Sequence, residues 1–178
     1  MNLRKLRSLV LVALCALPAA LSAEVKVLSG DGFTVQHSIA VEKDPEAVYH
    51  AMILIGQWWN PDHSWSGQPA NLYLDATPGG CFCERLPDGG GVTHLRIIYL
   101  KPGEQINFDG ALGPLQGMAV NGRMQWRIEA AESGSTVTFT YHVMGFMEGG
   151  FEGLAPAVDG VIGEQLMRLG AFVTAPVQ

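Results

Sequence analysis

The strongest constraint on the fold of this chain is a change of hydrophobic period along its length. From residue 33 to residue 143, apolar side chains recur at every second position in several short segments. From residue 151 to residue 173 they recur three and four positions apart. A period of two is typical of half-buried strands, and a period near 3.6 is typical of an amphipathic helix. The sequence therefore predicts a set of strands followed by a long terminal helix.

The first predicted strand lies in FTVQHSIAVE, which alternates between two faces. Its inward face would carry Phe33, Val35, His37, Ile39 and Val41. Further strands are expected in six segments that glycine- and proline-containing turns separate, namely 71–75, 79–87, 91–104, 105–112, 118–130 and 135–145. Strands joined by short turns favour antiparallel pairing.

Two helices are expected. After the first strand, Asp44 is a suitable N-cap and Pro45 suits the first helical position, so a helix is predicted there, ending near residues 56–59. The terminal helix carries one apolar stripe, formed by Leu154, Val158, Val161, Ile162, Leu166, Leu169 and Phe172. Gly160 and Gly163 weaken this helix by about 1 kcal/mol each relative to Ala, so they indicate close packing across a sheet.

These elements together predict an α+β fold, a curved antiparallel sheet of about six or seven strands around a long C-terminal helix. Their order resembles the helix-grip fold of the START/SRPBCC superfamily, which includes Bet v 1, polyketide cyclases and lipid-transfer domains. Several stretches resemble the branch named after the activator of heat shock protein 90 ATPase: DPEAVYHAM, WW, GGCFCE, YLKPGEQINF and VDGVIGEQLMRL. The resemblance implies a cavity between sheet and helix for a hydrophobic or amphipathic small molecule, and it implies no shared catalytic residue.

The first 23 residues have the pattern of a secretory signal peptide. A basic start, MNLRKLR, precedes an apolar run that ends in small residues. We therefore expect an exported protein, in the bacterial periplasm, with a leader at 1–23 and one domain at 24–178. An uncleaved anchor is the alternative; after cleavage no membrane span is expected. Heat shock protein 90 is not expected as a partner, because it is cytosolic and driven by ATP.

The charge of the mature chain excludes some partners. Without residues 1–23, 8 lysine and arginine residues remain against 17 acidic ones, a formal charge of −9. No basic stripe is left, so nucleic acid and anionic membrane surfaces are not expected partners.

The stretch WWNPDHSWSG, residues 58–67, combines three tryptophans with a histidine in a predicted loop. Such a loop either covers one end of the core or forms the entrance of a ligand site. His37, on the apolar face of the first strand, is either a hydrogen-bonded core residue or a ligand contact. The predicted ligand-binding residues are His37, Trp59, His63, Trp65, Met124, Trp126, Phe139, Tyr141, Leu154 and Val158, and Leu166 would help to close the cavity.

Two alternatives to a binding protein remain. The first is an enzyme, a cyclase, dehydratase or hydrolase, in which Glu84, His63 or His94 transfers protons within the cavity. It requires at least two of these groups to meet at one cavity.

The second alternative is a metal site formed by Cys81 and Cys83 with His63 and His94. The same cysteines could be two buried thiols or a redox pair. A disulfide is awkward, because side chains two apart on an extended strand are far apart for bridging. No phosphate-binding loop, G-x-S-x-G or H-E-x-x-H motif occurs, and no cofactor is expected.

Overall fold

A computed structural model describes residues 22–175. Its strands form one antiparallel sheet with the order β1-β2-β8-β7-β6-β5-β4-β3. The strands are β1 (Ser22–Ser29), β2 (Gly32–Val41), β3 (Leu72–Leu74), β4 (Cys81–Arg85), β5 (Gly91–Lys101), β6 (Gln105–Asp109), β7 (Val120–Ala131) and β8 (Gly134–Gly145). Strands that follow one another in the sequence are paired, except that β2 pairs with β8 and not with β3. That closure places the first and last long strands side by side.

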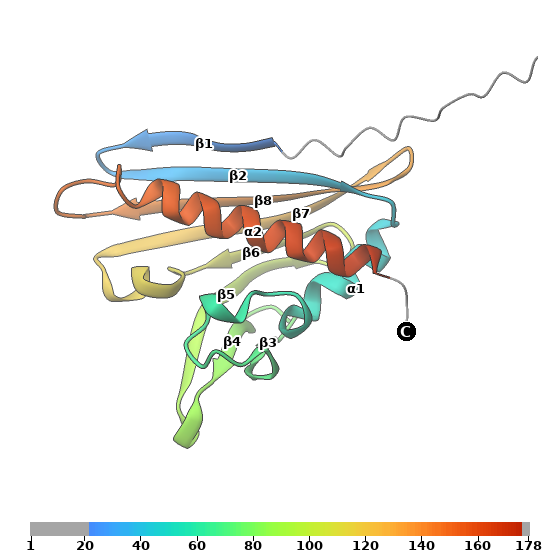
Figure 1. Cartoon of the computed structure of the whole chain (residues 1–178), viewed down its shortest axis with the longest axis horizontal. Helices are drawn as coiled ribbons and strands as arrows, with labels where there is room; N and C mark the ends of the chain where they lie inside the picture. The colour runs from blue at the N-terminus through green and yellow to red at the C-terminus, as the bar shows by residue number, and fades with distance from the viewer. Residues whose placement is uncertain (1–21, 176–178) are drawn as a thin grey trace, which may run out of the picture.

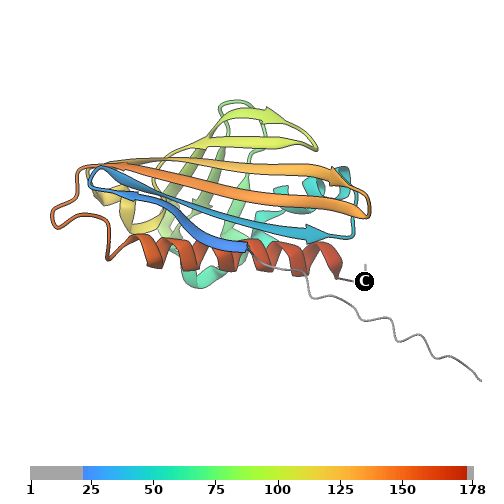
Figure 2. The same ribbon diagram turned by 90° about the horizontal axis from the view of Figure 1, so that it is seen from above.

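The long helix α2 (Ala155–Thr174) lies along one face of this sheet (Figures 1 and 2). The shorter helix α1 (Pro45–Ile53) contacts the same face and packs beside α2. The predicted α+β helix-grip fold is confirmed. Its sheet has eight strands rather than six or seven.

The additional strand is β1, which the sequence prediction missed. Its residues directly follow the apolar run of the predicted leader, and from Lys26 to Ser29 its side chains are exposed, so no inward-facing pattern marks it. Its backbone nevertheless pairs with β2, with a register shift between Val25 and Val27. Of the predicted leader, residues 1–21 lie outside the described residues, whereas Ser22 and Ala23 belong to β1.

Helix α1 forms where the capping residues predict it. The Asp44 carboxylate accepts a hydrogen bond from the Ala47 N–H at 2.9 Å, and Pro45 occupies the first turn. The helix ends earlier than expected, because Leu54 leaves the helical conformation. The chain continues as a 3₁₀ turn over Ile55–Gln57, and that turn delivers Trp58 to the core.

Glycines of α2 allow the helix to approach β2 closely. A Cβ atom added to Gly163 would lie 2.7 Å from Cε1 of His37, and one added to Gly170 would lie 2.7 Å from Cδ1 of Ile39. The close packing expected from Gly160 and Gly163 is therefore present at Gly163, whereas an added Cβ at Gly160 would meet no atom within 4 Å. It fixes α2 against the strand that carries His37.

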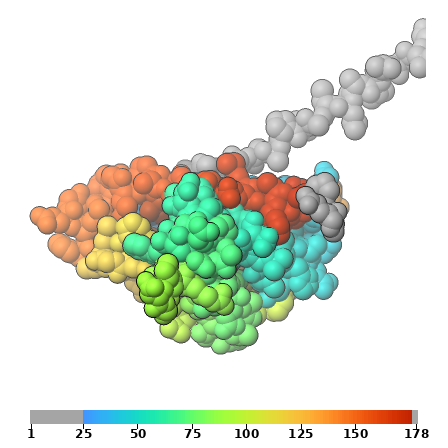
Figure 3. Space-filling model, turned by 60° about the horizontal axis from the view of Figure 1, so that its bottom comes forward, coloured from blue at the N-terminus to red at the C-terminus, as the bar shows by residue number. Residues whose placement is uncertain are grey.

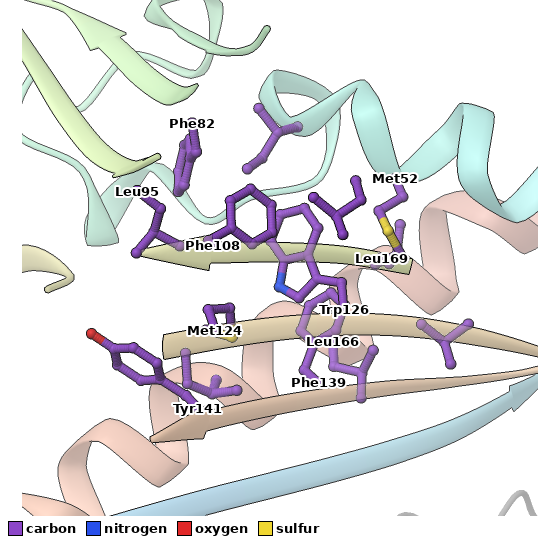
Figure 4. Close-up of a cluster of buried hydrophobic side chains, with 14 of the residues drawn as sticks. Met52, Phe82, Leu95, Phe108, Met124, Trp126, Phe139, Tyr141, Leu166 and Leu169 are labelled. Atoms are coloured by element: carbon purple, nitrogen blue, oxygen red, sulfur yellow. The ribbon is translucent and has the colours of Figure 1, made fainter. Parts of the chain in front are cut away.

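The centre of the interface between sheet and helix is solidly packed (Figure 4). The Trp126 ring stacks on Phe139 with centroids 4.8 Å apart and meets the edge of Phe108 at 4.7 Å. The side chains drawn there include five that the sequence analysis assigned to the cavity wall, and each is at most 1 % exposed: Met124, Trp126, Phe139, Tyr141 and Leu166. These residues belong to the core and not to a cavity wall, because aromatic rings from neighbouring strands fill the space beneath the helix.

Within residues 22–175, no helix is both long enough and apolar enough to cross a membrane.

Candidate functional site

A cavity of about 400 Å³ opens at the N-terminal half of α2. Three segments far apart in sequence and one strand residue enclose it, and Figure 3 shows the face on which those segments meet. The wall consists of Trp59, Asp62, His63, Ser64, Trp65, His94, Leu112, Gly113, Pro114, Leu115, Leu154, Ala157, Val158, Val161 and Ile162. A mainly apolar wall of this size with a few polar groups is typical of small-molecule sites.

The stretch 58–67 divides its three tryptophans between core and cavity. Trp58 is 1 % exposed, and its indole N–H donates to the Met52 carbonyl at 3.2 Å. Trp59 is buried in the cavity wall, with its indole N–H donating to the carbonyl of His63 at 3.1 Å. Trp65 lies in the wall but is 56 % exposed, which places it at the cavity mouth. The stretch therefore covers one end of the core and also forms a cavity entrance.

Hydrogen bonds tie this loop to α2. Glu164 accepts from the Asn60 side chain at 2.6 Å and pairs with His63 Nε2 at 3.1 Å. The Gln165 side-chain oxygen accepts from the Asn60 backbone N–H at 2.8 Å. Because α2 also supplies one side of the cavity, these bonds hold two of its walls together.

On the other side, the loop is tied to β4 through Glu84. The side chain of Glu84 has no exposed surface. Its two carboxylate oxygens accept hydrogen bonds from the backbone N–H groups of Trp65, at 3.0 Å, and Ser66. An ionised carboxylate is an acceptor only, so it suits two backbone donors. Glu84 thus holds the cavity mouth in place.

His94 reaches the same carboxylate from β5. Pairing between β4 and β5 shifts at this point: Phe82 faces Leu95 and Cys83 faces Thr93, so His94 is the extra residue of a β-bulge. The bulge turns His94 inward beside buried Leu95, whereas strict alternation would have placed them on opposite faces.

The His94 ring is held on two sides. Its Nε2 lies 2.9 Å from Glu84 Oε2, and its ring stacks on Phe82 with centroids 4.5 Å apart. Nδ1 has no hydrogen-bond partner among the described residues. It is also not one of the fully buried polar side-chain atoms that lack a partner. The protein therefore uses one ring nitrogen and leaves the other available.

The environment of this pair fixes its charges. Burial raises the pKa of the Glu84 carboxyl, but hydrogen bonds from Ser66, the Trp65 backbone and His94 outweigh burial, and the pKa lies below its ordinary value. Burial lowers the pKa of His94, and the contact with Glu84 only partly opposes this. At neutral pH the pair is thus a carboxylate and a neutral imidazole that donates from Nε2. Such a pair can accept a proton or a hydrogen bond at Nδ1.

The cavity brings together five of the residues predicted to bind a ligand: Trp59, His63, Trp65, Leu154 and Val158. His37 is elsewhere: it is 2 % exposed between β2 and α2, with Nε2 2.8 Å from Asp159. Of the two interpretations of His37, a hydrogen-bonded core residue or a ligand contact, the structure supports the first. Two of the proposed proton-transfer groups, His63 and His94, line the same cavity, and Glu84 lies directly behind His94.

Sequence reasoning missed the wall formed by the connection between β6 and β7. Leu112 and Leu115 line the cavity from this connection, although Leu112 was expected at the end of a strand over 105–112 and Leu115 was given no role. The available signal was the composition of GALGPLQG, in which two leucines sit among turn residues. The other wall residues not predicted as ligand contacts are Asp62, Ser64, Gly113, Pro114, Ala157, Val161 and Ile162.

The structure does not bring the proposed metal ligands together. Cys81 and Cys83 form a disulfide with their Cα atoms 5.4 Å apart. They alternate along β4 with Phe82 and Glu84, which face the interior, so they lie on the opposite side of the strand from the His94 contact. The residues described contain no group of three or more potential ligands placed to hold a metal. The expectation that a C-x-C bridge is awkward was wrong, because the two Cα atoms lie within the range of separations that a disulfide spans.

No protein-family model matches the sequence, and no curated protein matches it. Solved structures do resemble it. An uncharacterised protein from Rhizobium leguminosarum is 21% identical, with a TM-score of 0.59 over 86% of this chain and 97% of that one. A protein of unknown function from Staphylococcus aureus is 16% identical, with a TM-score of 0.54 over 80% of this chain and 94% of that one.

A third similar structure is the di-domain ARO/CYC protein StfQ from the steffimycin biosynthetic pathway. It is 15% identical, with a TM-score of 0.55, and the match covers 81% of this chain and 52% of that one. At such identities the likeness concerns the fold. Together with the observed topology, it identifies the chain as a helix-grip protein.

Proposed function

We propose that this protein binds a hydrophobic or amphipathic small molecule in the cavity beside the N-terminal half of α2. The observation that carries the proposal is the wall itself, which combines leucine, valine and tryptophan side chains with a few polar groups around about 400 Å³. The volume suits a ligand of two to four fused rings or a short lipid chain.

The experiment compares two variants of the same helix. Ala157 lines the cavity, whereas Ala171 lies on α2 away from it, and both are exposed. Ala157→Trp should fill the cavity and abolish binding of bicyclic aromatics, sterols or fatty alcohols, measured by native mass spectrometry and thermal shift. Ala171→Trp should leave binding intact. Equal binding by both variants would place the ligand elsewhere, and no binding by the unmodified protein would refute the proposal.

A second candidate function is proton transfer next to a carbonyl, which the pairing of His94 with Glu84 favours. The neutral imidazole would take a proton from carbon through Nδ1, the electron pair would move to the carbonyl oxygen, and the imidazolium beside Glu84 would return the proton. Deuterium exchange of 2-tetralone in D₂O, followed by NMR, tests this step. Exchange that the protein accelerates and His94→Phe abolishes supports it; exchange at the buffer rate contradicts it.

We also propose that the protein works outside the cytoplasm, since the pattern of residues 1–23 is that of a signal peptide. The five resembling stretches further support membership of the START/SRPBCC superfamily, in the branch of the heat shock protein 90 activators. Export would separate the protein from that chaperone, so the proposal keeps the ligand cavity of the superfamily and not the co-chaperone role. Mass spectrometry of the N-terminus in a periplasmic fraction tests the leader.

A further inference from the structure

We infer that the cavity selects neutral ligands that carry a hydrogen-bond donor, such as a hydroxyl or N–H group on an apolar body, and that it discriminates against carboxylates. The inference rests on the proposed binding function and specifies its ligand class. Its first premise is the hydrogen-bonding state of His94. Because Nε2 faces the carboxylate of Glu84 at 2.9 Å, the neutral ring carries its hydrogen on Nε2. Nδ1 is then an acceptor without a partner among the described residues.

The tautomer is fixed from behind, not by the ligand. Both oxygens of Glu84 already accept backbone N–H groups from Trp65 and Ser66, and these bonds favour the ionised carboxylate. A carboxylate cannot donate to Nε2, so the ring must donate. The available ring nitrogen of this wall residue can therefore accept from a ligand but cannot donate to it.

The charges around the cavity disfavour an anion. Asp62 lies in the wall, Glu84 lies behind His94, and Glu164 holds His63 at the rim. Among the described residues, no lysine or arginine lines the cavity. A ligand carboxylate would face these acidic groups in a site of low dielectric without a cationic partner.

The remaining feature that could attract an anion is the first turn of α2, since helix N-termini carry partial positive charge. All but one of its donors are already used or missing. The N–H groups of Leu154 and Ala155 donate to the Phe151 carbonyl at 3.0 and 2.9 Å, and Pro156 has no N–H. The N–H of the wall residue Ala157 is the one donor of this turn for which the described residues show no acceptor, and a single N–H does not offset the three acidic groups.

The test uses four ligands with one bicyclic body: 2-naphthol, 2-methoxynaphthalene, naphthalene and 2-naphthoate. Dissociation constants at pH 7 come from quenching of tryptophan fluorescence and from calorimetry. We expect 2-naphthol to bind about three- to tenfold more tightly than 2-methoxynaphthalene, which cannot donate, as one net hydrogen bond predicts. We expect 2-naphthoate to bind most weakly. This comparison needs no variant, so it remains decisive if a variant fails to fold.

His94→Phe then removes the acceptor and keeps a flat ring against Phe82. It should abolish the advantage of 2-naphthol over 2-methoxynaphthalene. His142→Phe is the matched control, because His142 is exposed and contacts Thr34; it should preserve the advantage. Binding of 2-naphthoate as tight as that of 2-naphthol would overturn the inference and leave the binding function standing. Failure of all four ligands to bind would overturn both.

Discussion

At the scale of single residues, the site depends on one buried carboxylate with three partners. Glu84 joins the loop at the cavity mouth to His94, and so it fixes both a backbone segment and a tautomer. Its position in β4, directly after Cys83, gave no sign of this role in the sequence. The inward orientation of His94 could not be predicted either, because alternation along β5 places it with exposed Arg96, and only the bulge reverses it.

Replacing this carboxylate should therefore be costly. Glu84→Gln keeps the size of the side chain but presents an NH₂ group to a backbone N–H that needs an acceptor. We expect the free energy of unfolding to fall by about 2–3 kcal/mol in urea denaturation. Glu104→Gln is the control, since Glu104 is a largely exposed partner of Lys101, and its effect should stay within about 0.5 kcal/mol. Equal losses in both variants would show that Glu84 has no special structural role.

Stability should also fall on acidification, in a window that begins near pH 6.5. The native pKa of His94 lies below its ordinary 6.5 because burial disfavours the cation. As pH decreases through 6.5, the unfolded chain binds a proton that the native protein does not, so the free energy of unfolding declines. Near pH 4.5 Glu84 acts in the same direction, since its native pKa is also lowered.

The measurement is urea denaturation at pH 7.5, 6.5 and 5.5, for the unmodified protein and His94→Phe. The decline between pH 7.5 and 5.5 should be smaller in the variant, because the variant lacks the titrating imidazole. A decline of the same size in both proteins would assign the pH dependence to other groups.

At the scale of elements, the helix-grip arrangement depends on the contact between α2 and β2. Gly163 sits against the ring of His37, whereas Gly160, three residues earlier on the same helix, has no atom within 4 Å of an added Cβ. The sequence showed that both glycines lie in a helix. It could not show which one is in contact, because that depends on the rotation of α2 relative to the sheet.

This pair provides a matched prediction. Gly160→Ala should raise the free energy of unfolding by about 1 kcal/mol through helix propensity alone. Gly163→Ala gains the same propensity but forces its methyl group to 2.7 Å from His37 Cε1, and it should lower the free energy of unfolding by about 1–3 kcal/mol. Thermal and urea denaturation of the two variants, side by side, give the comparison. Stabilisation by both would mean that α2 lies farther from β2 than described.

Prediction from sequence succeeded for elements with a regular period and failed where tertiary contacts decide. The alternation in β2, β7 and β8 and the stripe of α2 identify these elements without further information. The same alternation placed Trp126 and Phe139 correctly on the inner face, but it could not tell a packed core from a cavity wall. That difference arises because the cavity walls come from separate loops, whose positions no local pattern specifies.

At the scale of the whole molecule, packing is uneven along α2. The second half of the helix buries Leu166, Leu169 and Val173 in the aromatic core, whereas the first half borders the cavity. One end of the interface between sheet and helix can therefore hold the fold together while the other end accepts a ligand. A ligand should then stabilise the cavity segments and have little effect on the centre of the sheet.

Hydrogen–deuterium exchange with and without saturating 2-naphthol tests this division. We expect slower exchange on binding in three segments that carry the walls, 58–67, 112–118 and 154–162, because a filled cavity opposes their local opening. The β7–β8 turn at 132–133 lies outside the wall and serves as the internal control. Protection centred on the middle of β7 and β8 would contradict the account, since a ligand there would have to displace Trp126 and Phe139 from the packed core.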